Sequence, residues 1–125
     1  MPNFTDIERA VFNAICDGNP EVADTLRNLV ASAELTKRDN TGHGFYTYFA
    51  VDKSKPPLAL TLRMLDGPNI EAAVDAETLL MGFVLWLEDG YPGCLEGFQY
   101  STPKGDDFDL KLIDLGSIRW LRPLA

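Results

Sequence analysis

Residue types that often carry chemistry are scarce in this sequence, which has two cysteines, one histidine and three methionines in 125 residues. A single histidine cannot build a histidine-rich zinc site, and the sequence has no CxxC pair. It also lacks the GxGxxG and GxxxxGKS/T loops that cradle phosphates and the GxSxG motif of serine nucleophiles. We therefore predict no metal, no cofactor and no catalytic residue, and favour a protein that is not an enzyme.

The few candidates for reactive side chains lack suitable neighbours. Cys16 lies late in a predicted helix and Cys94 beside a predicted turn, so two free thiols are favoured, with a disulfide left as the alternative. Glu88 and Glu96 are expected near Cys94, and acids there would raise its pKa and keep the thiol inert. His43 is flanked by glycines, which is typical of a surface turn.

Long apolar runs are also missing. The longest, Leu79–Leu87, is far shorter than the ~20 residues that span a bilayer. The N-terminal MPNFTDIERAVF has acidic residues early and no basic leader, so it does not read as a secretory signal. We therefore expect a cytoplasmic protein with no membrane partner. Its 46% hydrophobic and 24% charged composition fits one globular domain.

The net charge is −8, and the excess of acid is concentrated in residues 64–118, which hold eleven acidic and two basic side chains. Such a balance repels a phosphate backbone, so we predict no nucleic-acid partner. It suits a basic protein partner through long-range steering. The alternative is that the acidity only keeps a small protein soluble.

The first part of the chain has helical periodicity. Thr5 and Glu8 form the pattern of a capping box, and the apolar stripe that follows ends at Asp17-Gly18. Asn19-Pro20 predicts a second helix that begins with a cap and a proline at its first position. The sequence therefore predicts an αα-hairpin over about residues 5–33.

From residue 34 to about residue 121 the period changes to two, which is typical of strands. The predicted strands are Glu34–Arg38, Gly44–Val51, Leu58–Leu65, Ile70–Asp75, the two arms of a hairpin over Leu79–Tyr100, and Phe108–Leu115, with Thr102–Asp107 a loop and Ile118–Leu121 a short strand or turn. Helices first and strands afterwards predict a single α+β domain over 1–125. In it the αα-hairpin packs on one face of a five- to seven-stranded, mainly antiparallel, curved sheet.

For the hairpin we predict a five-residue loop, Asp89–Gly93, because a two-residue turn at Asp89-Gly90 would place Pro92 inside a paired strand. This register pairs Glu88 with Cys94, Trp86 with Glu96, Val84 with Phe98 and Gly82 with Tyr100. The face predicted to receive the helices holds Met81, Phe83, Leu85, Leu87 and Leu95.

The opposite face of this hairpin is aromatic and carries one carboxylate. Together with two tyrosines of an earlier strand, it gives the candidate ligand-binding residues Tyr46, Tyr48, Trp86, Glu96, Phe98 and Tyr100. An uncovered patch of this kind marks a binding surface. Three interpretations stay open: an open groove, a homodimer whose aromatic faces meet, or a curled sheet that encloses these residues as ordinary core.

A resemblance rests on TGHGFYTYF at 41–49, the glycine-aromatic pair at 82–83, Asp89-Gly90 and LEGF at 95–98. In these segments the chain resembles, over about residues 35–100, a group of small bacterial proteins with no assigned activity. The resemblance implies an intracellular α+β protein and transfers no catalytic residues.

Some small acidic proteins of this general kind are immunity proteins of toxins. We therefore expect a non-enzymatic binding protein, such as an acidic immunity- or antitoxin-like partner of a basic protein. The alternative is a small-ligand-binding domain, or less readily an enzyme, that uses the six-residue aromatic set.

Overall fold

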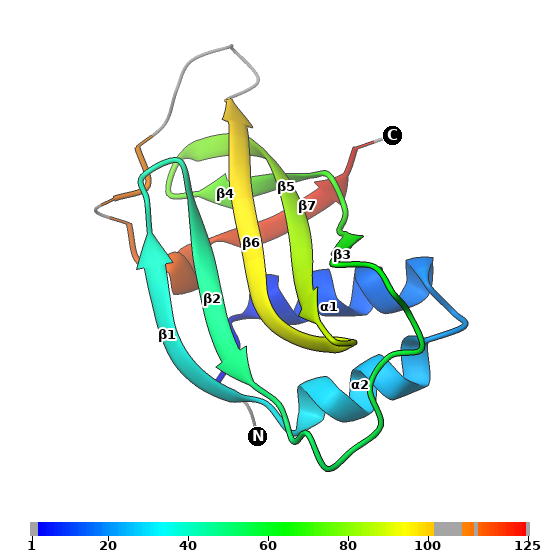
Figure 1. The fold of residues 1–125 in the computed structure, drawn as a ribbon. Helices are drawn as coiled ribbons and strands as arrows, with labels where there is room; N and C mark the ends of the chain where they lie inside the picture. The colour runs from blue at the N-terminus through cyan, green and yellow to red at the C-terminus, as the bar shows by residue number, and fades with distance from the viewer. Residues whose placement is uncertain (1–2, 102–108, 112, 125) are drawn as a thin grey trace.

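A computed structural model of the protein describes residues 3–101, 109–111 and 113–124. Two N-terminal helices pack against a curved, seven-stranded antiparallel sheet (Figure 1), which confirms the predicted α+β architecture. The elements are α1 (Asp6–Gly18), α2 (Ala23–Ala31), β1 (Glu34–Asn40), β2 (Gly44–Ala50), β3 (Met64–Asp66), β4 (Ile70–Val74), β5 (Glu77–Glu88), β6 (Tyr91–Ser101), a 3-10 helix η1 (Leu115–Ser117) and β7 (Arg119–Pro123). The strand order is β1-β2-β6-β5-β4-β7, with β3 beside β5. Within the described ranges, neither α-helix is long and apolar enough to cross a membrane.

The first helix begins as predicted. The Thr5 hydroxyl accepts a hydrogen bond from the Glu8 backbone, and the Glu8 carboxylate accepts one from the Thr5 backbone, which completes the capping box. The predicted start of the second helix is wrong, because α2 begins at Ala23 with Val22 as its N-cap. Asn19 instead closes α1: its backbone and side-chain amides donate to the Cys16 and Ile15 carbonyls.

The inner face of the sheet carries the core. In β2, Phe45, Thr47 and Phe49 are buried, as the predicted alternation requires. The Phe49 ring meets the rings of Phe4 and Phe12 edge-on, at centroid distances of 5.4 and 5.8 Å. These contacts place α1 on the inner face.

The hairpin arms supply the centre of this core. The five residues predicted to face the helices are all buried: Met81, Phe83, Leu85, Leu87 and Leu95. Gly97 also lies on this face, where a Cβ would come within 2.9 Å of both the Phe45 and Phe83 rings. Glycine at this position therefore leaves the space that the two rings fill.

The predicted five-residue hairpin loop is wrong. A two-residue turn, Asp89-Gly90, joins β5 to β6, and both of its residues have positive φ (54° and 84°), the signature of a type I′ turn. The register shifts after Trp86, so that Gly93 is an extra residue in β6, next to Pro92. A proline is tolerated at such a bulge because the hydrogen-bond ladder is already interrupted there.

The hairpin register therefore differs from the prediction by two residues. Trp86 pairs with Cys94, Val84 with Glu96, and Gly82 with Phe98 rather than Tyr100. Side chains alternate between the two faces with a period of two, so this shift leaves the paired side chains between Gly82 and Trp86 on their predicted faces. A second register shift, between Leu80 and Met81, makes Tyr100 an extra residue in β6.

The strand predicted over Leu58–Leu65 is mostly wrong, because only its last two residues belong to β3. Leu58 is buried, and its N–H donates to the Gly90 carbonyl at 2.9 Å. The chain is therefore bonded to the hairpin turn at Leu58, and it pairs with β5 only from Arg63 onward.

The strand predicted over Phe108–Leu115 is also wrong where the structure describes it, since 109–111 and 113–114 are irregular and η1 follows. Leu110 is buried, and its N–H donates to the Gly42 carbonyl, which anchors this segment to the β1–β2 turn. Phe108, Leu112 and the predicted loop Thr102–Asp107 lie outside the described residues. The alternative left open at Ile118–Leu121 resolves as a strand, β7.

Glu8 is fully buried where α1 meets β1 and β2. Its carboxylate accepts hydrogen bonds from the Arg38 guanidinium at 2.7 and 3.1 Å and from the Thr47 hydroxyl. Arg38 also donates to the Asn3 carbonyl. Burial alone would raise the pKa of Glu8, but the hydrogen bonds from Arg38, Thr47 and the Thr5 backbone outweigh it and hold the pKa below its ordinary value. This network fixes the start of α1 against two strands.

We expect Glu8→Gln to lower the free energy of unfolding by about 3 kcal/mol, because it leaves the Arg38 guanidinium without its counter-charge. Glu34→Gln, at an exposed position of β1, should change it by less than about 0.5 kcal/mol. The lowered pKa means that the contribution of Glu8 is present above the ordinary glutamate pKa and is lost as pH falls through the folded-state value. The difference in the free energy of unfolding between wild type and Glu8→Gln should therefore become smaller below about pH 4. Urea denaturation at about pH 7 and about pH 3 measures both effects; an undiminished difference at the lower pH would contradict this role.

Candidate functional site

The helices cover one face of the sheet, and we call the opposite face the outer face. Residues paired across neighbouring strands lie side by side on the same face, so the pairing arranges outer-face side chains in two adjacent rows. The first, the apolar row, runs across β1, β2, β6, β5 and β3 as Lys37, Tyr48, Cys94, Trp86 and Met64. The second, the acidic row, runs across the same strands as Asp39, Tyr46, Glu96, Val84 and Asp66.

The six candidate ligand-binding residues predicted from sequence all lie on the strands that form this face. Trp86 and Tyr100 are 41% and 55% exposed, and Met64, beside Trp86, is 40% exposed. Tyr46, Tyr48, Glu96 and Phe98 are half-buried. The curved sheet therefore does not enclose Trp86 and Tyr100 as ordinary core.

Glu96 organises the middle of the outer face. Its carboxylate accepts a hydrogen bond from the Trp86 indole nitrogen at 3.0 Å. The negative charge of Glu96, followed by burial and a hydrogen bond to the same carboxylate, raises the pKa of Tyr46. The Tyr46 and Tyr48 rings stack at a centroid distance of 6.1 Å, and the Lys37 ammonium lies 4.9 Å from the Tyr48 ring centroid. The Glu96 carboxylate thus interacts with two aromatic side chains, Trp86 and Tyr46.

Phe98 and Tyr100 form a separate part of this surface. Their rings meet edge-on at 5.4 Å, and the Tyr100 hydroxyl donates to the Asn69 side chain at 2.9 Å. The Phe98 ring lies over Gly82, where a Cβ would come within 2.7 Å of it. The glycine in β5 therefore leaves the space that this ring occupies.

Cys94 lies within the apolar row but is poorly suited to nucleophilic chemistry. Burial, followed by the charges of Glu96 and Asp39, raises the pKa of Cys94 to about 11. The direction agrees with the prediction. Glu88 was also predicted to raise this pKa, but it pairs with Tyr91 rather than Cys94 and does not contribute. Both cysteines are free, as favoured from the sequence.

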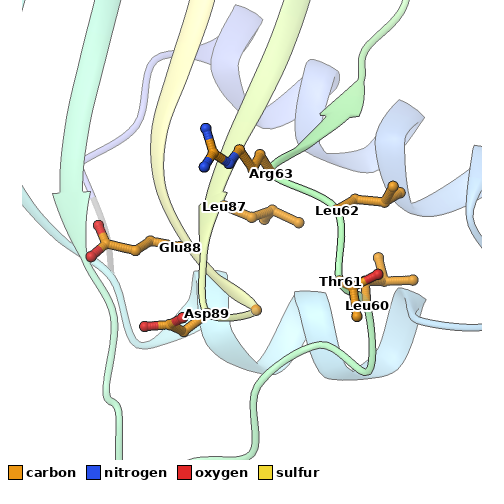
Figure 2. Close-up of a pocket in the computed structure, with 8 residues that line it drawn as sticks. Leu60, Thr61, Leu62, Arg63, Leu87, Glu88 and Asp89 are labelled. Atoms are coloured by element: carbon orange, nitrogen blue, oxygen red, sulfur yellow. The ribbon is translucent and has the colours of Figure 1, made fainter.

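Hollows at the surface lie outside the six candidate residues, although Met64 and Asp66, at the β3 ends of the two rows, line one of them. One of about 720 Å³ is lined by Leu60–Arg63 and by Leu87–Gly90 at the end of the hairpin. In Figure 2, Leu87 points toward the segment that carries Leu62, whereas the carboxylates of Glu88 and Asp89 point away from it. A second hollow, of about 450 Å³, separates β3 from the end of α1, and a third, of about 330 Å³, lies between the two helices. None of these three is lined by any of the six predicted residues, so the outer face is a broad surface beside them.

Sequence reasoning missed the part played by the segment Leu60–Arg63, which lines the largest of these hollows. The pair of prolines at 56 and 57 signalled an irregular start to this segment, but the alternating leucines that follow favoured a strand. In the part of the chain that the structure describes, no three His, Cys, Asp or Glu side chains are grouped so that they could hold a metal ion.

Comparisons with known proteins found no matching family model, no matching curated protein and no matching solved structure. The resemblance to small bacterial proteins therefore stays a prediction. Function must be argued from the outer face itself.

We expect alkylation of Cys94 by iodoacetamide to follow a titration with a midpoint near the thiol pKa of about 11. A Cys16→Ala background confines the reaction to Cys94, and Glu96→Gln should lower the midpoint because it removes a neighbouring negative charge. Rates measured across a pH series give both values. A midpoint below the ordinary thiol value of about 8.5 would show an activated cysteine and contradict this description of the site.

Proposed function

We propose that the protein is a non-enzymatic binding module whose outer face docks a basic protein. The observation that carries this proposal is the placement of the apolar row, with exposed Trp86 and Met64, directly beside the acidic row. Aromatic and methionine side chains are enriched in protein interfaces, and a few such anchors supply most of the binding energy.

The extent of the surface favours a macromolecular partner. Both rows cross five strands, so with neighbouring strands about 4.8 Å apart each row is about 20 Å long. Small ligands bind in concave sites that enclose most of their surface. The hollows described above lie away from the six aromatic-face residues, so a small-ligand pocket formed by those residues has less support.

The charge of the surface favours a basic partner. The acidic row places Asp39, Glu96 and Asp66 across the sheet in a chain of net charge −8, and Lys37 of the apolar row pairs with Asp39 at 3.4 Å. Glu96 and Asp66 therefore carry most of the attraction. An arginine of the partner could stack on Trp86 while its guanidinium bonds Glu96, since arginine combines ring stacking with bidentate recognition of carboxylates. The acidic field would also speed association with a basic protein.

An immunity- or antitoxin-like inhibitor of a basic protein is one form that such a module takes. A homodimer through the outer face is less favoured, because it would bury the carboxylates of two acidic rows in one interface, where like charges repel. The acidic row therefore selects against a second copy and for a basic partner.

The proposal is tested by placing a photo-cross-linking amino acid at Tyr48 on the outer face and, as a matched control, at exposed Asn28 on α2. Cross-linking in the source cell should capture a basic protein through Tyr48 and not through Asn28. With that protein purified, Trp86→Ala should weaken binding about 30-fold and Glu96→Gln about 10-fold, while Asn28→Ala leaves binding unchanged. Capture through α2 alone, or equal affinity in all three variants, would refute the proposal.

A further inference from the structure

Among the described residues, the strand β3 is paired along one edge only. On that edge the Leu87 N–H donates to the Arg63 carbonyl at 2.7 Å, and the Gly67 N–H donates to the Phe83 carbonyl at 2.8 Å. Backbone groups of successive residues in an antiparallel strand point to alternate sides. Those of Met64 therefore point away from β5, toward an edge that no described residue pairs with.

The strands β3 and β4 both pair with β5. The other edge of β4 is paired with β7, whereas no described strand pairs with the other edge of β3. The strand β7 pairs with β4 as far as Ile70–Pro123, and the Leu124 N–H then donates to the Asn69 carbonyl at 2.8 Å. In Figure 1, β7 runs along β4 and ends where the chain turns from β3 into β4. A strand added to the open edge of β3 would therefore lie in line with β7.

The two outermost strands of the sheet order carry features that discourage such pairing, and β3 carries few. The strand β1 has a bulge between Leu35 and Lys37 and is rich in charge, and β7 has two arginines and a proline. The segment that leads into β3 exposes two apolar side chains, Leu62 at 56% and Met64 at 40%, with the exposed Arg63 between them. Because β3 is only three residues long, pairing with the sheet of another molecule is limited, but its edge can still pair with a short peptide.

A hollow of about 450 Å³ lies beside this open edge, between β3 and the C-terminal end of α1. Its lining includes apolar Ile15, Leu62 and Leu65, which suits one apolar side chain of an added strand. The last turn of α1 contains no basic residue, and Asp66 lies on the same rim. Because a helix C-terminus carries partial negative charge, this rim favours lysine or arginine.

We propose that the open edge of β3 binds an extended, basic segment of a partner protein by β-strand addition. Backbone hydrogen bonds to Met64 and Asp66 supply the pairing, an apolar side chain fills the hollow beside Ile15, and a cationic side chain meets Asp66. The edge adjoins the outer face at Trp86, so this inference deepens the proposed function and rests on it for the positive charge of the partner.

The test uses a fluorescent synthetic peptide of about nine residues that alternates lysine and valine, the minimal probe with the period of a strand. Two further peptides carry N-methyl groups on alternate residues, in the two complementary sets. We expect binding of the parent peptide by the full chain, loss of binding by at least tenfold for one N-methylated set, and a change of less than threefold for the other, because only one set of amides faces β3.

Variants of the protein locate the site. Met64→Pro removes the outward N–H and should weaken binding at least tenfold, while Met64→Ala keeps that N–H and should weaken it less than threefold. Should Met64→Pro fail to fold, the two N-methylated peptides carry the test alone. Absence of binding, or equal effects of the two N-methylated sets, would overturn the edge proposal and leave the outer face to its own cross-linking experiment. Binding lost in Trp86→Ala but kept in folded Met64→Pro would also overturn it, and would place the peptide on the outer face.

Discussion

Glu8 lies at the start of α1 with its carboxylate buried between Arg38 of β1 and Thr47 of β2. The same carboxylate caps the helix through the Thr5 N–H, so helix initiation and helix docking use one side chain. Breaking a buried pair of this kind leaves an uncompensated charge, which makes alternative placements of the helix costly. The rings of Phe4 and Phe12 then pack on Phe49, so the helices cover the inner face of the sheet.

Because the helices pack on the inner face, the opposite face of the sheet is left exposed in the part of the chain that the structure describes. The two helices lie on one side of the seven-stranded sheet, and no described helix covers the other side, which carries Trp86, Tyr48 and Tyr46. Carboxylates in the neighbouring row give this surface its charge. The open edge at β3 belongs to the same region, because Met64 pairs with Trp86. A partner could therefore engage the face through side chains and the edge through backbone groups.

The sequence predicts most of this architecture because periodicity reports which side of a strand is buried. The hairpin shows the limit of that signal. Between Gly82 and Trp86 its register was predicted two residues away from the observed one, yet these side chains kept their faces, because the period of a strand is two. The error came from Pro92, which a bulge at Gly93 accommodates beside a type I′ turn. Local rules for proline could not anticipate a neighbouring bulge.

Tertiary contacts decide the remaining differences. The residues after Pro57 alternate like a strand, but the Leu58 N–H bonds the Gly90 carbonyl, so the chain reaches β5 only at Arg63. Asn19 resembles the cap of α2 and instead closes α1. The pairing places five of the six candidate residues on one sheet face, and Tyr100 lies at a bulge beside Phe98. Their form as two rows on an open surface depends on the register and on β3, which pattern alone does not give.

The central claim is that the outer face is open in the free protein and available to a partner. Hydroxyl-radical footprinting of the purified chain over a range of concentrations tests it most directly. The structure predicts rapid modification of Trp86 and Tyr100 at every concentration, alongside protection of Phe45. Modification of Trp86 as slow as that of Phe45, or modification that falls as concentration rises, would show that this face is already covered and would contradict the account.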